Sequence, residues 1–226
     1  MKKPRFTLTQ LLVVTGIVAT IACLALPIGT QMRENGRIMQ EASNLRQLGV
    51  GTAAYLADHN GKIFSTDSQG GWPSLLEQKY ITHWETFKSP FDMRPDGDTA
   101  SPSGAGVPVS YGINVNILTH STAGENAFEG DATRYTSPSQ LIYMAPNVDL
   151  TQSLLVFIPG MGDSNVALHV PTKAPATSNE NRGTHAKRSL ITVLFADYHT
   201  ENIKYRDFAT ASGADGFARW RPIHHP

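Results

Sequence analysis

Residues 6–32 read FTLTQLLVVTGIVATIACLALPIGTQM and contain no charged side chain. A helix needs about 20 predominantly apolar residues to span a bilayer, and this run offers 27. The hydrocarbon core of a bilayer contains no water that could hydrogen-bond to unpaired backbone groups. A single segment can therefore cross it only as a helix, in which the backbone groups bond to one another. The run therefore predicts a transmembrane helix whose most apolar part lies between Leu11 and Ile28.

The charges around this run predict its orientation. Lys2, Lys3 and Arg5 precede it, whereas the first 32 residues contain no Asp or Glu. Basic residues are enriched on the cytoplasmic side of membrane helices. We therefore expect a cytoplasmic N-terminus, membrane lipid as one partner, and a head on the opposite side of the membrane.

Two other export signals remain open for the same run. A signal peptide also combines a basic start with an apolar core, and Cys23-Leu24-Ala25 offers a small-residue cleavage site. A lipoprotein signal would use Cys23, although its box would begin with Thr20 where Leu is usual. The run is longer than a usual signal core, which favours an uncleaved helix. Cys23 is the single cysteine, so no internal disulfide can form.

Composition narrows the function classes. The chain has 226 residues, which suggests one domain with an appendage. Its 19 basic and 19 acidic side chains give a net charge of zero, so the chain lacks the overall positive charge that would indicate a nucleic-acid partner. Sequence motifs for a nucleophile elbow or a phosphate-binding loop are lacking, so we expect no catalytic activity. One small basic group lacks interleaved aromatic residues and is interpreted as a surface loop: Arg182, His185, Lys187 and Arg188.

The apolar helix is predicted to continue over residues 30–58. Gly49 and Gly51 suit close packing there, and Asn60-Gly61 provides a left-handed helix end. Four residues at spacings of three and four predict a buried stripe: Leu45, Leu48, Thr52 and Leu56. Five charged residues are expected on exposed positions: Arg33, Glu34, Arg37, Glu41 and Arg46.

The remaining residues predict a small head. A short helix is expected over 72–80, with Pro73 in its first turn. β-Branched and aromatic runs predict strands over 107–113, 140–145, 154–158, 166–170, 189–195 and 200–205. Residues 194–200 are expected to form the hairpin that joins the last two. The predicted fold class is therefore α+β, with a long N-terminal transmembrane helix packed on a small antiparallel sheet.

Several stretches resemble a known family, the type IV pilins and type II secretion pseudopilins. The similarity is to the branch with a prepilin-type cleavage and methylation N-terminus and a C-terminal His to Phe-Ala-Asp-Gly-His-like motif. The stretches that carry it are Phe6-Thr7-Leu8-Thr9-Gln10-Leu11-Leu12-Val13-Val14, Pro27, residues 41–49 and 55–61, Trp72-Pro73, Phe87-Lys88-Ser89-Pro90, Ser110-Tyr111-Gly112-Ile113-Asn114, Ser137-Pro138-Ser139 and His185 to His199.

The resemblance implies a domain plan and a function. Residues 1–5 would be a cytoplasmic leader, 6–29 the transmembrane helix of a pilin-like fold, 30–58 its extracytoplasmic continuation, and 59–226 the α+β head. The chain would be a structural subunit of a type II secretion or type IV pilus-like filament in the bacterial inner membrane. Prepilin peptidase would cleave between Arg5 and Phe6, with N-methylation of Phe6. Gln10 and Pro27 would take part in assembly with other pilin-like subunits.

The departures from the family pattern refine this expectation. Arg5 stands where the family has Gly, which argues against cleavage. Gln10 stands where the family has Glu, and a neutral amide cannot neutralise the free amine of a neighbouring subunit. These residues predict a minor or tip subunit, or alternatively a permanently anchored extracytoplasmic binding module that does not polymerise. Tyr198 replaces a Gly, which would be costly in a turn that needs a positive φ.

Two groups of residues are candidate metal sites. Asp92, Asp96 and Asp98 lie close together in a Pro- and Gly-rich loop, a setting that calcium can use, although a solvated acidic loop is the favoured interpretation. A metal-dependent hydrolase would use His185, Asp197 and His199, of which the last two would share a strand face. Turn and strand-edge polar residues are the simpler account of these three. We expect no cofactor, with calcium as the alternative.

Overall fold

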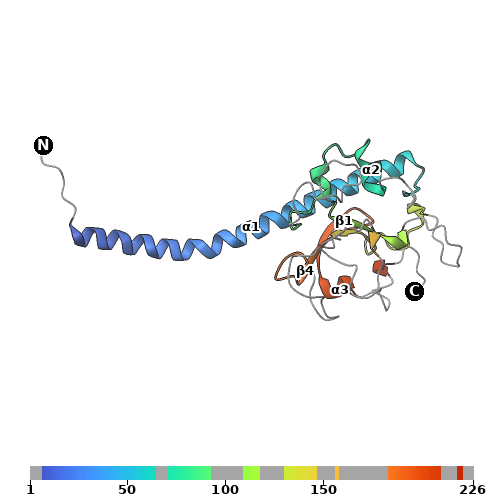
Figure 1. Ribbon diagram of the computed structural model, residues 1–226. Helices are drawn as coiled ribbons and strands as arrows, with labels where there is room; N and C mark the ends of the chain where they lie inside the picture. Colours follow the sequence, from blue (N-terminus) through green and yellow to red (C-terminus); the bar gives the residue numbers. More distant parts are fainter. Residues whose placement is uncertain are drawn as a thin grey trace. The chain divides into compact units, whose positions relative to one another are not determined.

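The computed structural model describes residues 7–64, 71–92, 109–117, 130–146, 156–157, 183–209 and 218–220. The chain divides into two compact units, residues 1–37 and 38–226. The boundary falls within α1 (Leu8–Asp58), the first element of the chain (Figure 1). The two units are described in turn.

The first unit begins α1 with a reciprocal cap. The Gln10 backbone N donates to Thr7 Oγ1 (3.3 Å), and the Thr7 backbone N donates to Gln10 Oε1 (3.1 Å). This is a capping box, in which a Thr and a Gln three residues later satisfy two backbone donors that the helix leaves free. Gln10 therefore has a structural role at the helix start, and either Gln or Glu can fill it.

The predicted fold class includes a transmembrane helix, and this part of the prediction is wrong. A span needs about 20 consecutive apolar residues, and within the described part of the chain no helix is both long enough and apolar enough to cross a membrane. Large apolar side chains of α1 nevertheless point outward. Those that are more than half exposed near the start of α1 are Leu8, Leu11, Leu12, Val13, Val14, Ile17, Val18 and Ile21.

In the second unit, α1 carries the predicted buried stripe. Leu45, Leu48 and Thr52 are fully buried and Leu56 is almost so. The helix ends as predicted, because Asn60 (φ 54°) and Gly61 (φ 77°) adopt the left-handed conformation. The Gly61 N donates to the Leu56 carbonyl (2.8 Å), which closes the last turn.

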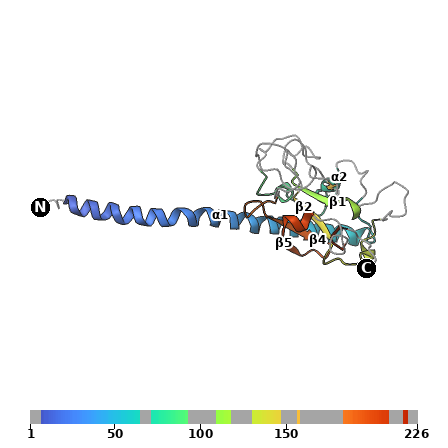
Figure 2. The same ribbon diagram turned by 90° about the horizontal axis from the view of Figure 1, so that it is seen from below.

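Two short helices lie beside this part of α1 (Figures 1 and 2). They are α2 (Gly71–Glu77) and the 3-10 helix η1 (Trp84–Phe87). α2 is shorter than the predicted helix over 72–80. Trp72, Phe64 and Phe87 form an aromatic cluster under these elements, with ring centroids 5.9–6.4 Å apart. Two further 3-10 turns are η2 (Val115–Ile117) and η3 (Ala132–Arg134).

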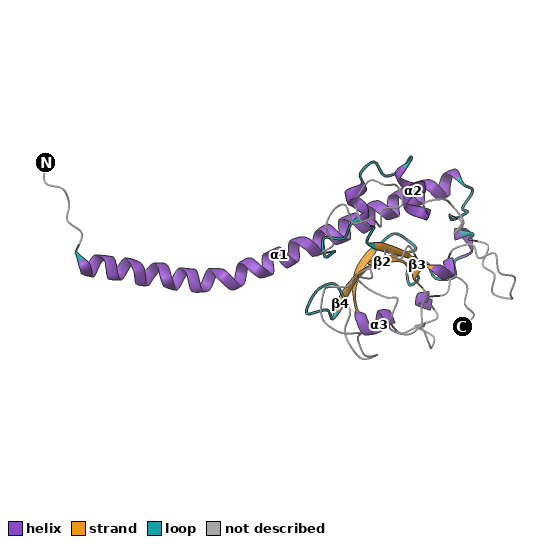
Figure 3. Cartoon of the chain, viewed as in Figure 1, coloured by secondary structure: helices purple, strands orange, loops and turns teal. Residues whose placement is uncertain are grey.

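The sheet of this α+β unit has the order β3-β1-β2-β4-β5 (Figure 3). Its strands are β1 (Tyr111–Asn114), β2 (Ile142–Pro146), β3 (Val156–Phe157), β4 (Leu190–Phe195) and β5 (Thr200–Lys204). The pairs β1–β2, β2–β4 and β4–β5 are antiparallel, whereas β3 pairs parallel to β1. The sheet is thus not purely antiparallel as predicted. The predicted strand over 166–170 lies outside the described residues.

Both faces of the sheet are covered, which places a core on each side. One core joins α1, α2 and η1 to the sheet through residues such as Leu45, Leu76 and Tyr143. The other lies between the sheet and α3 (Tyr205–Ala209), and includes Val193, Phe208 and Trp220. Covered faces explain why β1, β2 and most of β4 are continuously buried rather than alternating.

The β4–β5 hairpin is confirmed, and its turn contains a strained tyrosine. Tyr198 has φ 68°, the left-handed conformation that usually requires Gly. Its ring packs edge-on against Tyr143, with centroids 6.3 Å apart. A Cβ added to Gly49 of α1 would lie 3.3 Å from both Tyr198 and Leu194. The predicted close packing at Gly49 is therefore real, and contact with the helix compensates the turn conformation.

Asn114, at the end of β1, ties the sheet to a segment far along the chain. Its Nδ2 donates to the carbonyls of Ile142 and Trp220, both at 3.1 Å. Its Oδ1 accepts from the Asn116 N (3.1 Å), and Asn116 Nδ2 donates to the same Trp220 carbonyl (3.0 Å). Asn114 is completely buried, so water cannot replace these bonds.

We expect Asn114→Ala to reduce the free energy of unfolding by about 2–3 kcal/mol, because the buried Ile142 carbonyl loses its side-chain donor and the Asn116 N loses its acceptor. Asn116→Ala is the matched control, since Asn114 still serves the Trp220 carbonyl, and it should cost less than about 1 kcal/mol. Urea denaturation followed by circular dichroism measures both values. Equal losses in the two variants would contradict the assigned role of Asn114.

Candidate functional site

A buried polar centre forms where three stretches of the second unit meet. α1 contributes Glu41 and Asn44, the segment after η1 contributes Ser89 and Asp92, and β1 is entered through Ser110 and Tyr111. All six side chains are less than a tenth exposed. We call these six residues the carboxyl centre.

Glu41 was predicted on an exposed position, and this was wrong, because its side chain is completely buried. The position precedes Leu45 by four residues and Leu48 by seven, so it continues the buried stripe of α1. That spacing is the signal that could have identified it. Glutamate is rarely fully buried unless it is paired. The sequence prediction therefore followed the charge of Glu41 and not its place in the periodic pattern.

The carboxyl group of Glu41 is only partly satisfied. Ser89 Oγ donates to Glu41 Oε2 (2.5 Å) and itself accepts from the Phe91 N (3.1 Å). Glu41 Oε1 has no hydrogen-bond partner among the described residues. The Tyr111 hydroxyl lies beside the same carboxyl but makes no hydrogen bond of good geometry there. A charged carboxylate would therefore be poorly solvated in this centre.

Asp92 and Asn44 fix the segment that faces Glu41. Asp92 Oδ2 accepts from Ser110 Oγ (2.6 Å), and the Asp92 N donates to the Ser89 carbonyl (3.0 Å). Asn44 Nδ2 donates to the Lys88 carbonyl (2.9 Å). These bonds position Ser89 under Glu41 without using the carboxyl group itself.

Burial raises the pKa of Glu41 to about 8. The hydrogen bond from Ser89 and the nearby Tyr111 hydroxyl oppose the rise, and the negative charge of Asp92 adds to it. Burial also holds the pKa of Tyr111 well above its ordinary value. At neutral pH, Glu41 is accordingly a neutral carboxylic acid and Tyr111 a neutral phenol.

The proposed calcium ligands do not come together in the described part of the chain. Asp92 is buried and bound by Ser110, whereas Asp96 and Asp98 lie outside the described residues. The described residues also contain no group of three His, Cys, Asp or Glu side chains that could hold a metal ion. Asp92 thus acts in the structure as a hydrogen-bond acceptor that holds Ser110.

The hydrolase grouping is not supported by the geometry. His185 bridges to Leu190 at the beginning of β4, whereas Asp197 and His199 lie in the turn after its end. Six strand residues separate the two places, about 17 Å at the usual rise. Asp197 Oδ1 and His199 Nδ1 do pair (2.5 Å), but both side chains are exposed. His185 is instead buried and stacked on Phe91 (5.9 Å).

The expected processing and assembly residues are described only in part. Arg5 and Phe6 lie outside the described residues. Pro27 lies within α1, although its side chain is also outside the described part. Gln10 is exposed and engaged in the helix cap. Cleavage, methylation and the assembly role of these residues therefore stay predictions.

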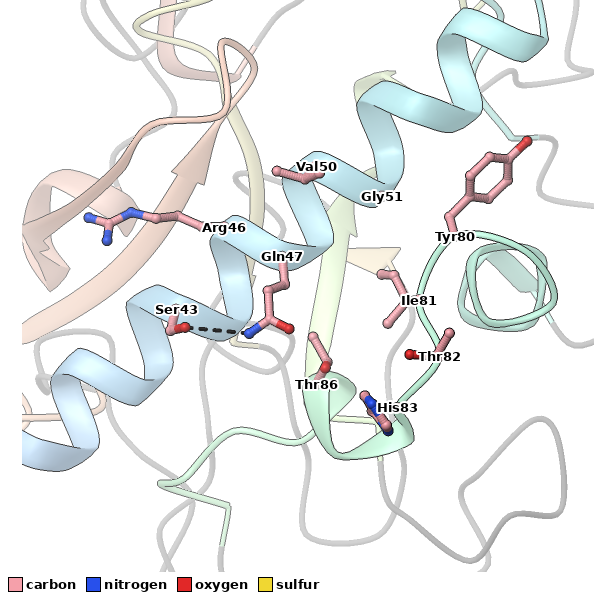
Figure 4. A pocket seen from close by; sticks show the side chains of 10 residues that line it. All are labelled: Ser43, Arg46, Gln47, Val50, Gly51, Tyr80, Ile81, Thr82, His83 and Thr86. Atoms are coloured by element: carbon pink, nitrogen blue, oxygen red, sulfur yellow. Dashed lines mark hydrogen bonds between the residues drawn. The ribbon is translucent and has the colours of Figure 1, made fainter.

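The second unit also contains a groove that no sequence motif predicted. It lies between α1 and the segment that joins α2 to η1, and its volume is about 340 Å³ (Figure 4). Val50 is 68% exposed at its edge. Gly51 lies so close to Ile81 that an added Cβ would approach it to 2.8 Å, which confirms the predicted close packing. The lining residues are Ser43, Arg46, Gln47, Val50, Gly51, Tyr80, Ile81, Thr82, His83 and Thr86.

The groove offers shape and mixed polarity rather than reactive groups. Arg46 and His83 are exposed and supply its basic nitrogen atoms, and Gln47 Nε2 donates weakly to Ser43 Oγ (3.4 Å) (Figure 4). Its described lining residues include no acidic side chain. Comparison with protein-family models, curated proteins and solved structures gives no match for this chain.

Proposed function

We propose that the chain is a structural subunit of the pseudopilin kind, which assembles with other subunits through the apolar start of α1. The observation that carries the proposal is the set of eight large apolar side chains between Leu8 and Ile21, each more than half exposed. They surround the helix rather than forming one stripe. A helix that is apolar on all sides requires cover from other molecules.

The energetic gain from such cover is large. Burial of one Leu, Ile or Val side chain contributes about 1.5–3 kcal/mol, so a few neighbouring helices could stabilise an assembly strongly. Identical helices that pack side by side through non-equivalent faces form an open filament where the rotation between neighbours does not close into a ring. The head would then determine which subunits and cargo come into contact.

Gln10 supports a minor or tip position within that proposal. Its amide closes the helix cap with Thr7, as a glutamate would, but it carries no charge to neutralise a buried amine. A subunit in the body of a filament would need this neutralisation at every contact, and Gln10 does not supply it. A location in the bacterial inner membrane and processing by prepilin peptidase stay predictions that accompany the proposal.

The test compares two charge substitutions in the full chain. Leu12→Glu places a charge in the middle of the apolar helix start, and we expect at least a tenfold rise in the concentration needed for assembly. Lys204→Glu is the control, because Lys204 is exposed on β5, and it should assemble as the wild type does. Negative-stain electron microscopy and sedimentation measure the assemblies. A wild type that stays monomeric, or a Leu12→Glu variant that assembles normally, would refute the proposal.

The second candidate is an anchored binding module that does not polymerise. The groove beside α1 favours it, since it offers a binding surface that needs no second copy. Arg5 also favours it, because it occupies the predicted cleavage position. Mass spectrometry of the N-terminus separates the two: a methylated Phe6 supports the filament subunit, whereas an intact Met1 to Arg5 supports the anchored module.

A further inference from the structure

We propose that Glu41 is a proton-controlled latch, which in its neutral form holds α1 against the segment after η1 and against β1, and which opens when the proton leaves. The proposal concerns the second unit alone and does not depend on filament assembly. It rests on the geometry of the carboxyl centre, and every residue it uses lies in the described part of the chain.

The first step is the burial of an incompletely bonded carboxyl group. Glu41 is completely buried, yet within the described part of the chain Oε2 alone receives a hydrogen bond, from Ser89. A carboxylate has about four acceptor positions, and leaving one oxygen without a donor at a buried site costs several kcal/mol. A proton on Oε1 removes the charge and turns that atom into a donor directed at the neighbouring Tyr111 hydroxyl.

The second step is the charge around the group. From the segment after η1, Asp92 faces Glu41 and opposes its ionisation. From β1, the titratable neighbour is Tyr111, which is neutral. His185 stands one layer further away, stacked on Phe91. Among the described groups that act on Glu41, the charged one is thus a second carboxylate, so a charged Glu41 would meet repulsion rather than an ion pair.

The third step is what the latch connects. The Glu41–Ser89 bond spans 48 residues and joins α1 to the loop that leads toward β1. The nearby contacts between these elements are the Asn44 bond to the Lys88 carbonyl and the packing of Phe91 against Ile38. If Glu41 becomes charged, water must enter to solvate it, and these two contacts are the next to separate. The expected opening is therefore local to residues 38–44 and 88–92.

The direction of the pH effect follows from proton linkage. The pKa of Glu41 is raised in the folded state, so between its ordinary value of 4.5 and about 8 the folded chain holds a proton that the unfolded chain has lost. The contribution of this proton to stability is complete below the unfolded pKa. It declines as pH rises, and the equilibrium constant for unfolding increases about tenfold per pH unit in that window. Above the folded pKa, the native state itself releases the proton and the latch opens.

The experiment measures urea unfolding of the full chain at several pH values between 5 and 9. Between pH 6 and 8 we expect the unfolding constant of the wild type to rise about 50-fold more than that of Glu41→Gln, whose amide carries no titratable proton. Glu85→Gln is the matched control, because the Glu85 side chain is exposed on η1, and it should keep the wild-type pH dependence. A Glu41→Gln variant with the wild-type pH dependence would overturn the latch.

A second measurement uses the wild type alone, in case Glu41→Gln does not fold. Carbon-13 NMR of labelled glutamate carboxyl groups follows the titration of Glu41, with assignment from triple-resonance spectra. A carboxyl group that titrates above pH 7 supports the latch, together with faster hydrogen exchange in residues 88–92 above that pH after correction for intrinsic rates. Titration below pH 6 would overturn it.

Discussion

Gly183→Ala is expected to destabilise the second unit by about 3 kcal/mol, because nearby backbone cannot move aside for a methyl group. An added Cβ would lie 2.1 Å from the Leu190 carbonyl oxygen and 2.8 Å from that of Arg188. The Gly183 N also donates to the Arg188 carbonyl (2.8 Å), so the contact closes the turn before β4. The methyl group would therefore force this turn apart.

The same turn has little freedom to adapt. Ala186, Lys187 and Arg188 are three consecutive residues with positive φ, between 49° and 66°. Each residue other than Gly costs about 1–2 kcal/mol in this conformation. Closing bonds such as that from the Thr184 N to the Leu190 carbonyl (2.8 Å) offset this cost. Further displacement would release the start of β4.

Urea denaturation at neutral pH measures the loss in Gly183→Ala. Gly36→Ala is the matched control, because no atom lies within 4 Å of the Cβ it would add within α1. It should leave stability unchanged or raise it by less than about 1 kcal/mol, since Ala is the better helix former. If Gly183→Ala were as stable as the wild type, the described closure of this turn would be incorrect.

Phe87→Ala is expected to cost about 4 kcal/mol, the usual loss when a buried phenylalanine is truncated without collapse of the site. Phe87 is completely buried, and its ring lies 4.8 Å from that of Trp84 and 5.9 Å from that of Trp72. Two large rigid rings border the space that the phenyl group would vacate, so the cavity should persist.

Phe87→Leu is the control, because it keeps much of the volume and should cost less than about 2 kcal/mol. Thermal unfolding and tryptophan fluorescence report the two variants, and the emission of Trp72 and Trp84 should shift to longer wavelength in Phe87→Ala. A loss below 1 kcal/mol in Phe87→Ala would show that Phe87 is not central to this core.

Local patterns predicted much of the head. Spacings of three and four identified the buried stripe from Leu45 to Leu56, and the Asn60-Gly61 pair located the end of α1. Short β-branched runs predicted β1, β2, β4 and β5, although the bounds differ by a few residues. These features depend on neighbours in sequence, which a single chain displays directly.

The carboxyl centre depends instead on distant neighbours. Glu41 is buried because Ser89, Asp92 and Tyr111 arrive from far along the chain. The residues next to Glu41 in the sequence do not indicate that these partners will surround it. An isolated glutamate in a helix is normally solvated. Parallel pairing of β3 with β1 is likewise a long-range contact that the short run around Val156 could not reveal.

For Tyr198 the sequence predicted the conformational cost of its turn but not the contacts that offset this cost. Its place in a turn that favours Gly predicted a conformational cost, and the positive φ confirms the conformation. The compensation comes from Tyr143 and from the bare backbone at Gly49, which belong to β2 and α1. The transmembrane prediction rested on length and missing charge alone, and the described helices correct it.

The bond between Asn114 and the Trp220 carbonyl constrains how the head can be made during translation. The two residues are 106 positions apart, which corresponds to about 5–20 s of synthesis at 5–20 residues per second. During this interval the nascent chain already carries the amide and lacks its acceptor. The head can therefore reach its final packing only after the ribosome has released residue 220, so early-made strands must wait, or be shielded, until then.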